Sequence, residues 1–219
     1  MDNTTLSADN YELQLELRRS TLYPKKRLLR IHKSYIEYDG KSMFFKDVAA
    51  VRYGVLVNFV NGIKANTSYV VGLKDVNGIK LNITFVSMLG LKKEEIENKY
   101  DNIVDALWYA VTSRLVTEFY ETLKQGGSFT LKNIETTPLG FNFRKGWFVK
   151  KNYFVPWEKT LKVVDKGFVR VYSNEKKRIG SSLRLIHDWN GVVFHALMDW
   201  LWKEGRVYGL AENKEKKGI

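Results

Sequence analysis

Cations and aromatic rings are most densely mixed in residues 144–151, which read RKGWFVKK. Lys and Arg side chains can pair with phosphate or carboxylate groups, while an exposed aromatic ring can enter a lipid or protein interface. A turn at Gly146 would present both kinds of group together. In the alternative interpretation, Trp147 packs in the core and the lysines protect a strand edge from pairing. The predicted ligand-binding residues are Arg144, Lys145, Trp147, Phe148, Lys150 and Lys151.

Two further basic clusters are weaker candidates. Residues 176–178 fall at a predicted hairpin tip, and residues 25–27 with Arg30 precede a predicted strand. Exposed turns are commonly charged, so simple solvation is the alternative for both clusters. The net charge of +12 lies mainly in residues 126–219, which carry 18 Lys+Arg and 9 Asp+Glu. A field of this sign attracts nucleic acid, anionic lipid or acidic protein without choosing among them.

Residues that could support catalysis are sparse. His32, His187 and His195 stand outside any nucleophile or metal-ligand pattern, and only the last two could approach each other along a helix. The sequence contains no cysteine and shows no phosphate-binding loop, dinucleotide fingerprint or paired-carboxylate signature. We therefore expect no catalytic residue, no metal site and no cofactor, and we predict that the chain is not an enzyme.

Membrane-spanning and secretion signals are also missing from the sequence. No apolar run approaches the ~20 residues that cross a bilayer, so we expect no transmembrane segment. The polar N-terminus lacks the basic and apolar regions of a secretory signal. With no cysteine, a reducing cytosol is the simplest compartment. We expect a cytoplasmic protein, or one bound peripherally at a membrane.

The elements that would position the basic residues follow from the hydrophobic periodicity of the first half. The dipeptides Asp39-Gly40 and Asn77-Gly78 predict tight hairpins, because Gly accepts positive φ. Residues 61–67 are polar and are predicted to form a loop. Alternation of apolar and polar residues predicts strands at 11–17, 28–38, 43–53, 55–60, 68–73 and 79–86.

The periodicity changes to that of a helix after residue 92. Apolar residues recur at steps of three and four over residues 94–125, and Gly126-Gly127 ends the pattern. A continuous helix of this length would extend roughly 48 Å at ~1.5 Å per residue, which exceeds the width of one small domain. We therefore expect residues 114–124 to bridge to a second domain or to pair with another chain.

The second half repeats this order of strands followed by a helix. Asp188 is a plausible N-cap for a final helix that ends before Gly205. Trp200 and Trp202 lie two residues apart, so one of them is expected to point away from its own domain. Residues 206–219 form a charged tail that we expect to be disordered. Short strands are predicted at 129–134, 141–143, 147–149, 153–157, 161–164, 168–172 and 183–186.

Local similarities between the halves indicate an internal duplication. Residues 43–47 (MFFKD) resemble residues 153–158 (YFVPWE), and the hairpin at 69–85 resembles the one at 168–185. The first copy is longer, and we place its extra residues in 49–67 and 86–99.

The second copy resembles a bacterial pleckstrin-homology-like (PH-like) domain. The resemblance rests on RKGWFVKKNYFVPWEKT, on the following hairpin through residues 168–185, and on a helix beginning at Asp188-Trp189-Asn190. The first copy is similar in order, with Lys46-Asp47 where Pro-Trp-Glu would stand. The resemblance covers most of residues 10–205. It implies two seven-strand barrels, each capped by a C-terminal helix, and it implies binding rather than catalysis.

The resulting prediction is a mainly β protein with α-helices (α+β), built from two tandem PH-like barrels of antiparallel strands. The first domain would span residues 10–125, including the long helix, and the second would span residues 128–205. The predicted function is non-catalytic binding or scaffolding, in which basic hairpins contact an acidic protein or an anionic membrane surface. The alternative is nucleic-acid binding by the basic, aromatic C-terminal half. The helices are a further candidate for homo-oligomer contacts.

Overall fold

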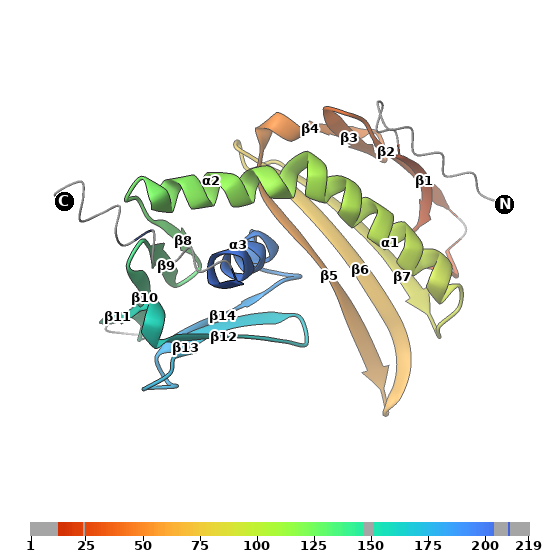
Figure 1. Ribbon diagram of the computed structural model, residues 1–219. Helices are drawn as coiled ribbons and strands as arrows, with labels where there is room; N and C mark the ends of the chain where they lie inside the picture. The colour runs from red at the N-terminus through yellow and green to blue at the C-terminus, as the bar shows by residue number, and fades with distance from the viewer. Residues whose placement is uncertain (1–12, 24, 147–150, 204–209, 211–219) are drawn as a thin grey trace. The chain divides into compact units, whose positions relative to one another are not determined.

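The computed structural model describes residues 13–23, 25–146, 151–203 and 210. The chain divides into two compact units, Met1–Arg114 and Leu115–Ile219. Both units are mainly β, with antiparallel strands followed by helix (Figure 1), as the alternating pattern predicted. The boundary between the units falls inside the helical region, and the domain ranges 10–125 and 128–205 stay predictions. The charged tail 206–219 lies outside the described residues apart from Leu210.

The first unit contains two antiparallel sheets. Leu13, Leu15 and Leu17 are buried while the residues between them are exposed, which is the burial pattern of a sheet with one face on the core. The first sheet is a meander of β1 (Leu13–Arg18), β2 (Lys26–Ile31), β3 (Tyr35–Tyr38) and β4 (Lys41–Phe44). The 3₁₀ turn η1 (Phe45–Asp47) leads to the second sheet, formed by β5 (Val48–Val60), β6 (Ile63–Asp75) and β7 (Lys80–Met88).

The second unit has the same order of elements. Its first sheet consists of β8 (Phe129–Leu131), β9 (Ile134–Thr137), β10 (Gly140–Lys145) and β11 (Lys151–Pro156). The 3₁₀ turn η3 (Trp157–Lys159) leads to a second sheet of β12 (Thr160–Asp165), β13 (Phe168–Ser173) and β14 (Gly180–Arg184). Helix α3 (Gly191–Lys203) follows. Among the described strands, the four sheets remain separate and no closed barrel forms.

The two 3₁₀ turns correct the alignment of the halves. Phe45 and Trp157 each begin such a turn, and both side chains are buried. Phe45 therefore corresponds to Trp157, so Phe44-Phe45-Lys46 stands where Pro-Trp-Glu stands in the second unit. The sequence comparison had placed Lys46-Asp47 there, because it matched aromatic residues without the turn that fixes their register.

The β5–β6 hairpin is the main extension of the first unit. Its strands pair from Val48 to Val60, whereas β12 and β13 are short. The extra length falls within residues 49–67, as predicted. However, the predicted loop at 61–67 is wrong, because Asn61 and Gly62 have φ of 51° and 78° and form a tight turn from which β6 continues. Polar composition obscured an Asn-Gly hairpin signal there.

The long helix is present and changes its hydrogen bonding once. It comprises α1 (Lys93–Leu107), the π-helical segment η2 (Trp108–Thr112) and α2 (Ser113–Lys124). In the π segment, the Thr112 hydroxyl donates to the Leu107 carbonyl at 3.3 Å and also bonds the Tyr53 hydroxyl. This buried pair holds the wider turn on the core of the first unit. Gly126, with φ of 87°, follows the helix end as predicted.

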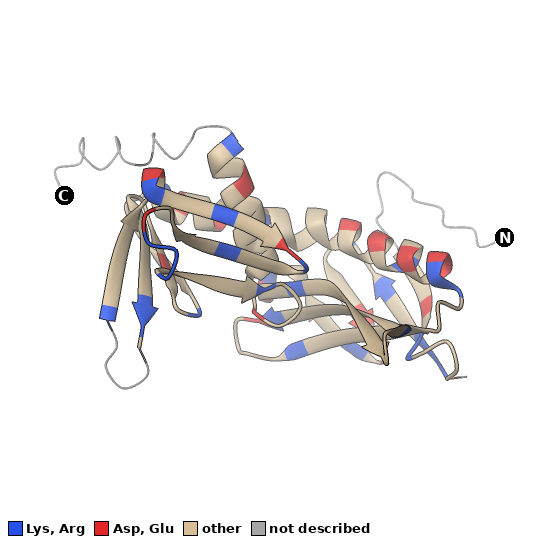
Figure 2. Cartoon of the chain, turned by 90° about the horizontal axis from the view of Figure 1, so that it is seen from below, with Lys and Arg blue, Asp and Glu red and all other residues tan. Residues whose placement is uncertain are grey.

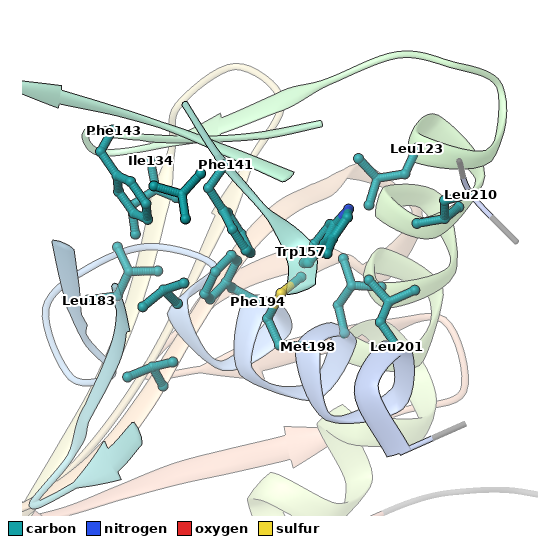
Figure 3. Packing of buried hydrophobic residues seen from close by; sticks show 14 residues of the cluster. Leu123, Ile134, Phe141, Phe143, Trp157, Leu183, Phe194, Met198, Leu201 and Leu210 are labelled. Carbon is teal, nitrogen blue, oxygen red and sulfur yellow. The ribbon is translucent and has the colours of Figure 1, made fainter. Parts of the chain in front are cut away.

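The core of the second unit gathers around α3 (Figure 3). The Phe141 ring lies 4.4 Å from Trp157 and 6.3 Å from Phe194, measured between ring centroids. Residues of α2 also join this core, including Leu123, as expected for a helix that continues past residue 114. Both tryptophans of α3 pack within the unit, because Trp202 faces Trp157 and Trp200 faces Tyr120 of α2.

Two local predictions in the second unit are wrong. The carboxylate of Asp188 accepts the Arg184 N–H at 2.7 Å, so it closes a turn before α3 and is not the cap of that helix. The similarity of residues 153–158 to residues 43–47 predicts a structural role for Phe154, Val155 and Trp157, but Phe154 is half exposed. Val155 and Trp157 are buried, the first near the end of β11 and the second in the 3₁₀ turn that follows it.

Candidate anion-binding site

The predicted ligand-binding residues flank the β10–β11 hairpin. Arg144 pairs with Asn152 and Lys145 with Lys151 across the two strands. Arg144 and Lys151 are exposed, while Lys145 is partly buried. Trp147, Phe148 and Lys150 lie outside the described residues. The hairpin joins the third and fourth strands of the unit.

Lys145 lines an open pocket of about 360 Å³ on the second unit. The pocket brings Lys145 together with Lys177 and Arg178, which belong to the second basic cluster of the sequence, and with Arg170 of β13. No carboxylate lines it. We call this site the basic pocket; its remaining lining residues are Val163, Tyr172, Gly180, Ser181 and Ser182.

The β13–β14 hairpin positions most of the basic pocket. Arg170 and Tyr172 alternate with buried Val169 and Val171, so they share the outward face of β13. Arg170 lies opposite Ser182, and its guanidinium sits 5.6 Å from the centre of the Phe168 ring. This cation–π contact orients the Arg170 side chain while leaving its N–H donors available.

Gly180 keeps the space beside Tyr172 open. Tyr172 pairs with Gly180 across the hairpin, and a Cβ at position 180 would lie 2.3 Å from the Tyr172 Cβ and 2.6 Å from the Val171 carbonyl oxygen. Any side chain there would displace the strand or the tyrosine. Glycine therefore permits the close approach of β13 and β14 at the pocket.

The one acidic residue of the β13–β14 loop is held away from the basic pocket. Glu175 bonds Lys159 at 2.9 Å, and this hydrogen bond raises the pKa of the Lys159 ammonium. Among the described residues, no carboxylate forms an ion pair with Lys145, Arg170, Lys177 or Arg178. Four cations around one open pocket repel one another, and an anion placed among them would relieve that repulsion.

Three of the four residues of the third basic cluster (25–27 with Arg30), by contrast, are paired with carboxylates of the first unit. Lys26 pairs with Glu16 and lowers the pKa of that carboxyl, chiefly through a hydrogen bond. Arg27 lies 3.5 Å from Asp39, and Arg30 lies 3.6 Å from Glu37. These cross-strand pairs favour a structural role for the cluster.

Each described histidine is engaged in a local contact. His32 stacks on Tyr35 at 4.1 Å between ring centroids, and the His195 Nδ1 lies 3.0 Å from the Asp199 carboxylate. His187 forms part of the turn before α3. Over the described ranges, no group of three or more His, Asp or Glu side chains is placed to hold a metal ion.

Asp199 joins α3 to β12 through Lys162, which is only 13% exposed. Burial raises the pKa of Asp199, but the hydrogen bond and charge of Lys162 outweigh it, so the pKa falls below the ordinary 3.8. The Lys162–Asp199 ion pair therefore makes its full contribution to the free energy of unfolding above the ordinary pKa of an aspartate. This contribution is lost as the pH falls through the lower pKa that Asp199 has in the folded protein.

We expect Asp199→Asn to destabilise the second unit by about 1 kcal/mol at neutral pH, because Lys162 loses its carboxylate. Urea unfolding of both proteins between pH 7 and pH 2 measures the difference. The gap between wild type and variant should begin to shrink at about pH 4, where the carboxyl of the unfolded chain becomes protonated, and should close as the pH falls through the lower folded pKa of Asp199. A gap that stays constant into acid would contradict the ion-pair assignment.

Sequence reasoning found part of the basic pocket. It identified Lys145 and the 176–178 cluster separately, but nothing in their spacing joined the two hairpins. It missed Arg170 and Tyr172, whose alternation with buried valines was the available signal.

Comparison with known protein families, curated proteins and solved structures finds no match to this chain. No helix within the described part of the chain is long and apolar enough to cross a membrane.

Proposed function

We propose that the chain is a non-catalytic binding protein with two tandem PH-like domains, whose second unit holds an anionic group of its partner in the basic pocket. The partner is an acidic protein or an anionic lipid surface. The order of seven strands, in sheets of four and three, followed by a helix occurs in each unit and supports the PH-like interpretation. The observation that carries the function is the gathering of four cations with no lining carboxylate.

The chemistry of the basic pocket suits a phosphate or carboxylate group. Arg170 and Arg178 supply forked N–H donors that match both anions, and Lys145 and Lys177 add mobile point charges. Ser181, Ser182 and Tyr172 supply hydroxyl groups beside them. The pocket is open and lined by four cations, unlike the enclosed, largely apolar sites that bury small substrates. This favours a group displayed on a surface over a free metabolite.

Nucleic-acid binding is the second candidate. Tyr153 and Phe154 are exposed on β11, the second strand of the β10–β11 hairpin. Exposed rings beside cations can stack bases while the cations pair with phosphates. This function predicts affinity for single-stranded oligonucleotides that falls steeply with salt concentration. Loss of binding in Phe154→Ser, with the cations intact, would favour it over the protein and lipid partners.

The matched test replaces Arg170, Lys177 and Arg178 with Gln in one variant. Its control replaces Lys33, Lys41 and Lys80 with Gln. These three lysines are exposed on the first unit, and their replacement removes the same amount of charge. Each cation near an anionic surface contributes about 1 kcal/mol, so the pocket variant should bind roughly 100-fold more weakly. Binding is measured with phosphatidylcholine vesicles, with and without phosphatidylserine, and with polyglutamate.

The two ligands distinguish the partners. Loss confined to the phosphatidylserine vesicles identifies a lipid surface, and loss confined to polyglutamate identifies an acidic protein. Equal losses in the pocket variant and in its control would show that net charge alone is responsible and would exclude the basic pocket as the site.

A further inference from the structure

Six large apolar side chains stand exposed on three loops of the first unit. They are Leu22 between β1 and β2, Phe59, Val60 and Ile63 at the tip of the β5–β6 hairpin, and Leu89 and Leu91 between β7 and α1. Each is at least half exposed, and Ile63 reaches 70%. We call these six residues the apolar end. Single exposed apolar residues are ordinary, but a group drawn from three loops indicates an interaction surface.

Backbone contacts bring the three loops to one end of the unit. The Thr21 N–H donates to the Val86 carbonyl at 3.1 Å, and the Met88 N–H donates to the Thr21 hydroxyl at 3.1 Å. The Leu89 N–H donates to the Ala65 carbonyl at 2.9 Å, which joins the loop after β7 to the β5–β6 hairpin. The loops therefore form a continuous surface.

The β5–β6 hairpin projects beyond its neighbour. Strand β7 ends at Met88, opposite Asn66, while β6 begins at Ile63 (Figure 1). Ile63, Lys64 and Ala65 therefore extend the tip beyond Asn66 by about 10 Å at ~3.3 Å per residue. Such a projection matches the ~5–10 Å to which interfacial elements enter the boundary between lipid headgroups and acyl chains.

The loops of the apolar end carry cations and no carboxylate of their own. Residues 17–36, 48–74 and 76–93 contain no Asp or Glu. Arg19, Lys25 and Lys64 lie on the same loops, and no described carboxylate pairs with any of the three. Lys92 and Lys93 follow Leu91 and are paired within α1, to Glu95 and Glu97. On the loops themselves the apolar side chains are therefore flanked by cations, and the Glu95 and Glu97 carboxylates of the following helix are paired with lysines.

We propose that the apolar end inserts into an anionic lipid bilayer, with Phe59, Val60 and Ile63 below the headgroups and Arg19, Lys25 and Lys64 paired with lipid phosphates. Charge complementarity selects this partner over a second copy, because two chains of net charge +12 would bring like-charged loops together. Shallow insertion leaves the hairpin's free backbone groups in the hydrated headgroup region. The proposal concerns the first unit and does not depend on the basic pocket.

Vesicle partition tests the proposal with charge held constant. Phe59→Thr/Ile63→Thr removes two apolar side chains from the tip, while Val76→Thr/Ile79→Thr removes two equally exposed ones from the β6–β7 turn. Partition of the full chain is measured on phosphatidylcholine vesicles with and without phosphatidylglycerol. We expect at least about a tenfold loss on the anionic vesicles for the tip variant, because both side chains supply apolar area, and none for the control.

A fluorescent label reports insertion directly. The chain has no cysteine, so Val60→Cys and, as control, Val76→Cys each give a single site for an environment-sensitive dye. Anionic vesicles should raise and blue-shift the emission at position 60 only, and they should do so even when the basic-pocket substitutions are present. No shift at position 60, or equal losses in the two Thr variants, would overturn the proposal. So would a dimer in solution that the tip variant dissociates, because a second copy would then cover the apolar end.

Discussion

Replacing Trp157 with alanine is expected to cost the second unit about 3–5 kcal/mol, the range for removing a large buried aromatic side chain. Trp157 is only 5% exposed and begins the 3₁₀ turn between the two sheets of its unit. Its ring lies 4.4 Å from Phe141 and 5.5 Å from Trp202, so both sheet and helix lose contacts. Its indole N–H also donates to the Pro138 carbonyl at 2.9 Å, which would be left without that donor.

Hydrogen exchange resolved by unit is the appropriate measurement, because a chain with two units need not unfold in one step. Trp157→Ala should raise exchange throughout β10 and α3. Trp157→Phe keeps an apolar ring but loses the hydrogen bond, and it should cost about 1–3 kcal/mol. Phe45→Ala, at the equivalent turn, should act on the first unit instead. If Trp157→Ala left hydrogen exchange in α3 unchanged, the contacts of the Trp157 ring would not stabilise the packing of α3 on the sheet.

The periodic parts of the fold were predictable because each depends on local chemistry. Asp39-Gly40 adopts positive φ at both residues and joins β3 to β4, as the sequence indicated. The helix over 94–125 was predicted to within one residue at each end, because a sustained apolar stripe and a terminal Gly pair define it. In such segments, local preference and tertiary packing agree.

The remaining features depend on contacts between distant residues. The π segment requires Thr112 to meet Tyr53, and no helical pattern contains that information. The basic pocket requires the end of β10 to lie near the β13–β14 loop, which only the packing of two sheets decides. Sequence reasoning therefore identified the charged segments but could not tell which of them would be neutralised, as in the pairing of Arg27 with Asp39.

The two units share one order of elements but present different surfaces. In the first unit, a pocket of about 250 Å³ beside β1 and α1 mixes cations with Glu16 and Glu95, and ion pairs join them. In the second unit, the basic pocket lacks carboxylates, and Figure 2 marks the Lys and Arg positions along its strands. The longer β5–β6 hairpin belongs to the first unit alone. Each unit therefore presents its own candidate binding surface, the apolar end in the first unit and the basic pocket in the second.

Gly140→Ala is expected to destabilise the second unit by about 3 kcal/mol or more, through backbone strain and overpacking together. Gly140 begins β10 with φ of 151°, a conformation that residues with a Cβ rarely adopt. A Cβ at this position would lie 2.3 Å from the Val155 carbonyl oxygen and 2.7 Å from the Pro156 Cα. Both are backbone atoms of the paired strand, so no side-chain rotation relieves the clash, and β11 must move away from β10.

The control is Gly167→Ala, in the tight turn between β12 and β13. Gly167 has φ of 78°, but nothing lies within 4 Å of the position that its Cβ would occupy. Its substitution should cost only the conformational strain of about 1 kcal/mol. Urea unfolding followed by near-ultraviolet circular dichroism, which reports the packed tryptophans, measures both variants. Equal costs for the two would mean that β10 and β11 do not approach as closely as their register requires, and the β10–β11 hairpin would then be free to carry Lys145 away from the basic pocket.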